Sequence, residues 1–124
     1  MKDIRFFEEA IAKEIRDIEA IGINPAMFWA YRTSKEVGND LIDFHEIIWD
    51  SDIPGIAESC KKNDIREFTI SCTFSSLIKV LAKFEQLGFK VGGLATAKAN
   101  YTDFITGEFA VVPAIRMVLA DEHQ

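Results

Sequence analysis

The chain has 124 residues, 48% hydrophobic and 27% charged, a balance typical of one globular domain and not of a disordered segment. Its net charge of −6 disfavours binding to nucleic acid or to an anionic membrane surface, and no apolar run approaches the roughly 20 residues of a membrane span. Two cysteines, Cys60 and Cys72, are too few for a disulfide framework, and no signal-peptide core is present. We therefore expect a cytoplasmic protein with two buried, reduced thiols.

Helical periodicity dominates the first part of the chain. Apolar residues recur every three or four positions and predict a first helix, capped by Asp3 and ended by Gly22. Asn24-Pro25 is a cap followed by proline at the first helical position, which predicts a short aromatic helix over 26–31. The apolar stripe of the first helix is Ile4, Phe7, Ile11, Ile15 and Ile18.

A second long helix is predicted over 34–49. Thr33 and Glu36 fit a capping box, and the apolar residues that follow again step by three and four. Gly38 weakens this helix, so a break near Gly38-Asn39 stays open. Asp50, Ser51 and Asp52 then offer caps for a short helix that contains Ile53, Ile56, Ala57 and Cys60.

From Phe68 the period of the apolar pattern changes to two, which predicts a strand that ends near Cys72. Thr73 or Ser75 would cap the next helix, and Gly88 would end it. Its buried stripe is predicted to be Leu77, Val80, Leu81, Phe84 and Leu87.

Two further strands complete the pattern. The first runs over 89–104 and carries a bend or bulge at Gly92-Gly93. A tight turn at Thr106-Gly107 would pair Asp103 with Ala110 and Tyr101 with Val112. Pro113 indicates an edge or a bulge in the last strand, whose end would face the core through Ile115, Met117 and Leu119.

These elements predict an α+β fold, in which N-terminal helices precede a β-α-β-β unit and helices cover one face of a three-stranded mixed sheet. We expect a single domain over 1–124, mainly helical over 1–64 and a strand-helix-hairpin over 65–120. If the first two strands are neighbours, they are parallel with a right-handed crossover; the alternative places the third strand between them.

Two segments carry a resemblance. They are the strand Glu67–Ser71 with Thr73-Phe74-Ser75, and the hairpin Tyr101–Phe104 with Thr106-Gly107-Glu108 and Pro113–Met117. Together they resemble small uncharacterised proteins of Gram-positive anaerobes and their mobile elements. The resemblance covers the second half of the chain best. It implies the same fold and a bacterial, cytoplasmic setting, and it transfers no functional residue.

Hydroxyl side chains crowd the junction between the first predicted strand and the next helix. A helix N-terminus presents free N–H groups and the positive end of its dipole, so this junction is a candidate anion site. It lacks the glycines and the lysine of a phosphate-binding loop, and plain helix capping is the simpler interpretation. The candidate ligand-binding residues are Ser71, Thr73, Ser75 and Ser76.

Acidic residues and one histidine fall on the second long helix. Asp43, Glu46 and Asp50 would share its outer face as a metal site or an acid–base pair, but a solvated charged face is the simpler interpretation. Cys72 at a strand end would suit a nucleophile of lowered pKa with His45 as its base, against the simpler alternative of a buried thiol. We therefore predict no catalytic residue, no metal and no cofactor.

Two aromatic segments are candidate interfaces. The short helix over 26–31 is too rich in large side chains to bury all of them on one surface, so either it is surrounded by the core on most sides or part of it is an interface. The hairpin tip places apolar groups beside a free strand edge. The candidate interface residues are Phe28, Trp29 and Tyr31, with Tyr101, Phe104 and Ile105.

The pattern indicates a small non-enzymatic interaction or regulatory protein that forms a homo-oligomer or binds a protein partner. One alternative is a small-molecule binding domain or small enzyme that holds an anionic ligand at the helix start over 73–76. A second alternative is an acidic decoy that occupies a nucleic-acid-binding protein.

Overall fold

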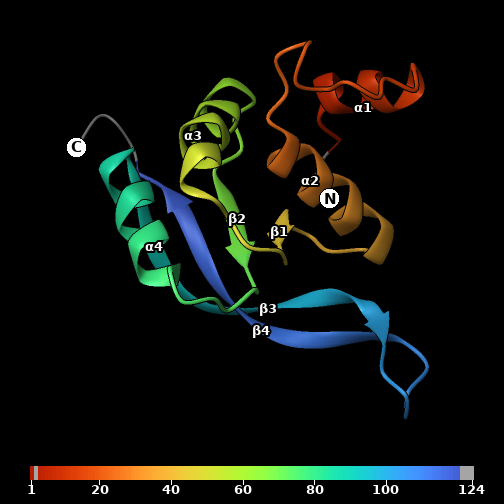
Figure 1. Cartoon of the computed structure of the whole chain (residues 1–124). Coiled ribbons are helices and arrows are strands. Elements are labelled where there is room, and N and C mark those ends of the chain that lie inside the picture. Colours follow the sequence, from red (N-terminus) through yellow and green to blue (C-terminus); the bar gives the residue numbers. More distant parts are fainter. Residues whose placement is uncertain (2, 121–124) are drawn as a thin grey trace.

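A computed structural model describes residues 1 and 3–120. Those residues form four α-helices and a four-stranded mixed sheet (Figure 1). No helix within these ranges is long and apolar enough to cross a lipid bilayer. The helices are α1 (Arg5–Ala12), α2 (Pro25–Val37), α3 (Ile53–Lys62) and α4 (Leu77–Gln86); the strands are β1 (Asp43–Phe44), β2 (Glu67–Ile70), β3 (Phe89–Thr102) and β4 (Phe109–Leu119), and a 3-10 turn at Asp50–Asp52 precedes α3.

The predicted α+β class is confirmed, but the sheet has four strands and not three. Its order is β1-β2-β4-β3, with β1 parallel to β2 and every other neighbouring pair antiparallel. The last strand therefore lies between β2 and β3, as the alternative order predicted. The additional strand, β1, was predicted as part of a helix.

The core joins both halves of the chain. The ring centre of Phe68 lies 5.2 Å from those of Phe44 and Phe84 and 5.6 Å from that of Phe89. Phe84 thereby packs α4 onto β2 and β3, which confirms the predicted stripe of that helix. In Figure 1, α4 and α2 lie to either side of the strands, and α2 lies next to β1.

The first helix is shorter than predicted. It ends at Ala12, and Glu14 takes a left-handed φ of 52° that turns the chain. The turn redirects the segment after α1, so that Ile18 and Ile23 enter the core from a loop. Gly22 belongs to this loop and not to a helix end.

The prediction of a long helix over 34–49 is wrong. α2 continues through the expected capping box and ends at Gly38, whose φ of +80° confirms the predicted break. Three consecutive buried residues follow, Ile42, Asp43 and Phe44, and the last two form the strand β1. Helical spacing of the apolar residues concealed this strand, because a two-residue strand has no period of its own.

The start of α2 follows its sequence signal. Asn24 Oδ1 accepts a hydrogen bond from the N–H of Met27 at 3.0 Å, and Pro25 occupies the first turn. This confirms the predicted cap, since the side chain satisfies a free N–H group of the first turn.

α1 is attached to α2 by a polar cluster. The buried hydroxyl of Tyr31 accepts a hydrogen bond from the N–H of Ile4 at 3.2 Å and donates one to Glu8. Lys35 also donates to Glu8. The hydrogen bonds from Lys35 and Tyr31 lower the pKa of Glu8, and burial together with Glu8 raises the pKa of Tyr31.

β3 bends at its glycine pair, as predicted. The register with β4 shifts between Val91 and Gly93, and Gly93 has a φ of +116°. A Cβ at Gly92 would lie 2.7 Å from Val118 Cγ2, so a side chain there would clash.

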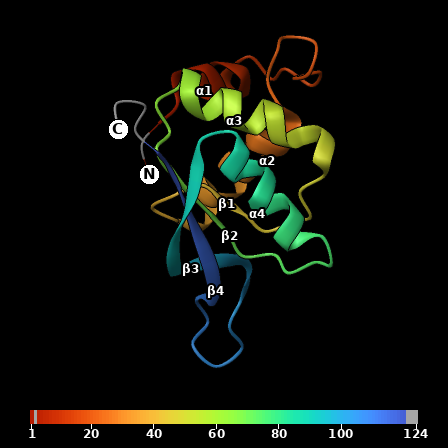
Figure 2. The ribbon, with the colours of Figure 1, turned by 90° about the vertical axis from the view of Figure 1, so that its left-hand side faces the viewer.

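β3 pairs with β4 alone along its whole length. Just beyond the bulge β3 still lies against the segment after α2, since Asn39 bonds to Lys98 and Ala97 is buried. The outer part of the two strands projects away from the helices (Figures 1 and 2). We call residues 93–114 the hairpin arm.

The predicted register of the hairpin, with Asp103 opposite Ala110, is wrong. Thr102 pairs with Phe109, and residues 103–108 form a longer loop. The carboxylate of Asp103 accepts a hydrogen bond from the N–H of Ile105 at 2.7 Å. This side-chain bond stabilises the longer loop, which replaces the predicted tight turn. The prediction of an edge at Pro113 is confirmed, because β2 pairs with β4 only from Ile115 onward.

Candidate functional site

A buried carboxylate on β1 is bonded to the carboxyl end of β2. Asp43 is 2% exposed, and its two oxygens accept hydrogen bonds from Thr69 Oγ1 at 2.7 Å and from Ser71 Oγ at 2.6 Å. Its N–H donates to Ser34 Oγ at 2.8 Å. Parallel pairing sets Asp43 beside Thr69, which explains why these side chains meet. These hydrogen bonds connect α2, through Ser34, with β1 and with the end of β2.

The hydroxyl-rich junction after β2 does not cap α4 as predicted. α4 begins at Leu77, later than expected, and its cap residue Ser76 makes no side-chain capping bond. Thr73 and Ser75 are exposed, while Ser71 donates to Asp43. The hydroxyl of Ser71 is therefore already bonded to the carboxylate of Asp43. The negative charge of this carboxylate makes the junction unfavourable for an anionic ligand.

Neither cysteine has a reactive environment. Burial raises the pKa of the Cys60 thiol to about 12, which fits its position in the core. The pKa of Cys72 is also raised, by burial and by the charges of Glu46 and Asp43. The hypothesis of a nucleophile with a lowered pKa is therefore wrong, because two carboxylates next to a thiol disfavour the thiolate.

The acidic residues predicted to share one helix face are separated. Asp43 is buried in β1, Glu46 follows it on an exposed loop, and Asp50 pairs with Lys83 at 2.8 Å. The three therefore do not share a helix. Among the residues described, no cluster of three or more His, Cys, Asp or Glu side chains is arranged to hold a metal ion.

The aromatic helix divides into core and surface. Phe28 and Tyr31 are 3% and 0% exposed, so they pack in the core, the first of the two alternatives for this helix, and are not interface residues. Trp29 is 52% exposed. It lines a groove of about 440 Å³ between α2 and the segment 44–52, and Trp49 lies on the same groove with 65% exposure.

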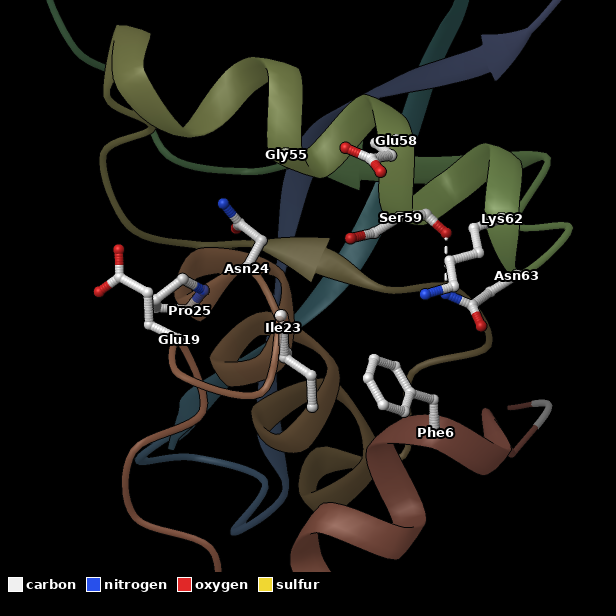
Figure 3. Close-up of a pocket in the computed structure, with 11 residues that line it drawn as sticks. Phe6, Glu19, Ile23, Asn24, Pro25, Gly55, Glu58, Ser59, Lys62 and Asn63 are labelled. Carbon is white, nitrogen blue, oxygen red and sulfur yellow. Dashed lines mark hydrogen bonds between the residues drawn. The ribbon is translucent and has the colours of Figure 1, made fainter.

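A second hollow, of about 250 Å³, lies between α1, the loop after it and α3 (Figure 3). Phe6 and Lys62 face each other across it, with the ammonium of Lys62 5.0 Å from the ring centre. Every buried side-chain nitrogen or oxygen in the described part of the chain has a hydrogen-bond partner. No orphaned polar group there calls for a ligand in this hollow.

The hairpin arm carries the most exposed apolar side chains. Phe104 is 100% exposed and Ile105 is 90% exposed at its tip, and Tyr101 is 59% exposed on β3. All three predicted residues of this segment thus reach solvent. Leu94 at 88% and Val111 at 64% extend the apolar surface along the strands.

Sequence reasoning missed Leu94, Val111, Ile47 and Trp49. For Leu94 a signal existed, because it stands between two small residues, Gly93 and Ala95, on a predicted strand. Ile47 and Trp49 were missed because the segment that carries them was predicted as a helix, and in the structure it is a loop that lines the groove.

A family model described as a domain of unknown function, DUF7698, matches residues 26–119 of this chain. Comparisons with curated proteins and with solved structures gave no match. The matched range contains the whole sheet, the hairpin arm and every lining residue of the groove except Pro25.

Proposed function

Because the chain belongs to the DUF7698 family, a domain of unknown function, we propose a function from its surfaces: it is a non-catalytic interaction protein that self-associates through the hairpin arm. The observation that carries this proposal is the set of large apolar side chains exposed on a projecting hairpin. Soluble proteins rarely expose apolar surface on this scale without a binding role.

The arm offers most of the apolar surface that a stable dimer needs. Its six most exposed large apolar residues together present on the order of 700 Å², taking about 150–250 Å² for a fully exposed large side chain. A standard interface buries about 800 Å² on each partner. The arm and its immediate surroundings therefore approach the area needed. These residues are Leu94, Tyr101, Phe104, Ile105, Phe109 and Val111.

Backbone geometry also favours a second copy. β3 is an edge strand, and an edge pairs readily with an identical strand across a two-fold axis. The side chain of Asn39 binds the N–H and C=O of Lys98 at 2.7 and 3.0 Å, which closes the edge at that residue. Pairing with a second chain is thereby directed to the outer part of the arm.

Charge supports the same contact. The arm has one basic residue, Lys98, and two acidic ones, Asp103 and Glu108, so its net charge is −1. The remaining residues hold 13 basic and 18 acidic side chains, a net charge of −5 out of −6. Two copies that meet through their arms keep most of the like charges apart.

Light scattering on the purified chain tests the proposal. We expect a mass of twice 14.0 kDa at micromolar concentration, and the monomer mass for the double variant Phe104→Ser/Ile105→Ser. Ile78→Ser is the matched control, because Ile78 is 81% exposed on α4, outside the arm. All of these side chains are exposed, so the variants should keep the thermal midpoint of the wild type.

Two results would contradict self-association through the arm. One is a monomer mass for the wild type across the whole concentration range. The other is a dimer that the Ile78 variant disrupts as strongly as the arm variant, which would place the contact on α4.

A further inference from the structure

The groove between α2 and the segment 44–52 combines exposed indole rings with carboxylates. Its lining includes Trp29 and Trp49, together with Glu46 and Asp52, and none of the described residues that line it is a lysine or an arginine. Within the described residues, Glu46 makes no side-chain hydrogen bond or ion pair, and Asp52 accepts only a long contact of 3.5 Å from Asn24. The groove is therefore both aromatic and negatively charged.

We infer that this groove binds a basic segment of a partner polypeptide, with an arginine or lysine side chain seated against the indole rings and beside Glu46. An indole face attracts a cation electrostatically, and an adjacent carboxylate adds a charged hydrogen bond. At about 440 Å³ the groove is large enough for such a side chain and its neighbours.

The chain already makes this contact once within itself. The guanidinium carbon of Arg32 lies 5.4 Å from the ring centre of Trp29. The surface around Trp29 thus accepts a guanidinium group. A basic side chain of a partner could make the same cation–π contact with Trp49, because none of the described residues places a cation over that ring.

Neighbouring charges leave the groove negative. Arg32, which lies over Trp29, is paired with Glu36 at 3.9 Å, and Lys83 is bound to Asp50 at 2.8 Å. Glu46 and Asp52 therefore set the charge of the lining. The net charge of −6 adds a long-range attraction for a basic partner. This surface is separate from the arm, none of whose residues line the groove.

Titration with two blocked pentapeptides tests the inference. Ala-Arg-Ala-Arg-Ala is the probe and Ala-Gln-Ala-Gln-Ala is its neutral control, with tryptophan fluorescence and indole N–H NMR shifts as readouts. We expect saturable binding of the arginine peptide alone. Trp49→Ala and Glu46→Gln should each weaken it about tenfold, as for the loss of one cation–π contact or one charged hydrogen bond.

Two control variants show whether the peptide binds in the groove or elsewhere on the acidic surface. Glu85→Gln removes an equal charge from an exposed site on α4, and it should leave the affinity unchanged. Phe104→Ser alters the arm, so it should leave peptide binding intact even if self-association is lost. Each variant is checked for an unchanged thermal midpoint.

Three outcomes would overturn the inference. They are no saturable binding up to about 1 mM peptide, equal weakening by the Glu46 and Glu85 variants, and a Trp49 variant that turns a dimer into a monomer. The second would show attraction by net charge alone, and the third would make the groove a contact between copies.

Discussion

Replacing Asp43 should destabilise the chain more than replacing any nearby exposed acid. The side chain is 2% exposed, and its oxygens accept hydrogen bonds of 2.7 and 2.6 Å from Thr69 and Ser71. A hydrogen bond to a charged group contributes about 1.5–3 kcal/mol, so the two together contribute about 3–6 kcal/mol. Burial of the carboxylate offsets part of this. We expect Asp43→Ala to lower the free energy of unfolding by about 2–4 kcal/mol, a large part of the ~5–15 kcal/mol of a typical domain.

Asp43→Asn should cost about half as much, because the amide keeps the shape and one acceptor oxygen. The measurement is the urea midpoint at constant slope, with Asp40→Asn as the control on an exposed neighbour. That control should shift stability by less than about 0.5 kcal/mol.

A double-mutant cycle with Thr69→Val isolates the hydrogen bond. Once Asp43 is alanine, the hydroxyl of Thr69 has lost its acceptor, so the second substitution should cost at least 1 kcal/mol less than it does alone, roughly the value of one such bond. If the two substitutions are additive, or if Asp43→Asn leaves the midpoint unchanged, the carboxylate does not fasten β1 to β2 and the reasoning fails.

Three further predictions concern other residues. Hydrogen bonds from Lys35 and Tyr31 lower the pKa of Glu8 from its usual 4.5. The stability that this carboxylate contributes is therefore present at neutral pH and is lost as the pH falls through the lowered pKa. The difference in urea midpoint between the wild type and Glu8→Gln should become smaller between about pH 6 and pH 3. Iodoacetamide at about pH 8 should modify Cys72 slowly and leave Cys60 untouched in the native chain, as read by mass spectrometry, and fast labelling of Cys60 would contradict its burial. Gly38→Ala should cost about 1 kcal/mol or more in a urea titration, because φ is +80° at that residue, and an unchanged midpoint would speak against the left-handed conformation.

Elements with a repeated pattern could be predicted from the sequence. The stripe that includes Val80 and Phe84 identified α4, and the alternation around Phe68 identified β2, because each repeats over several turns or pleats. The bulge at Gly92-Gly93 was also predictable, since paired glycines in a strand have few other uses.

Elements that depend on contacts between distant segments could not be predicted. β1 has two residues, and its burial depends on pairing with β2 and on the hydroxyl of Ser34. The register of the hairpin depends on hydrogen bonds of the Asp103 side chain, which composition does not reveal. The groove could not be predicted for the same reason. Trp29 and Trp49 line it from two separate segments, and the second of these was predicted as part of a long helix.

The projecting tip of the hairpin arm has a consequence for how this chain could be altered. β3 has buried residues on both sides of its bulge, among them Phe89 and Ala97, so the inner part of the strand is constrained by folding. At the tip Phe104 and Ile105 are exposed, and substitutions there cost little stability. The residues of the tip can therefore be changed without disturbing the core. The same property makes the loop over 103–108 a suitable place to graft a foreign recognition sequence.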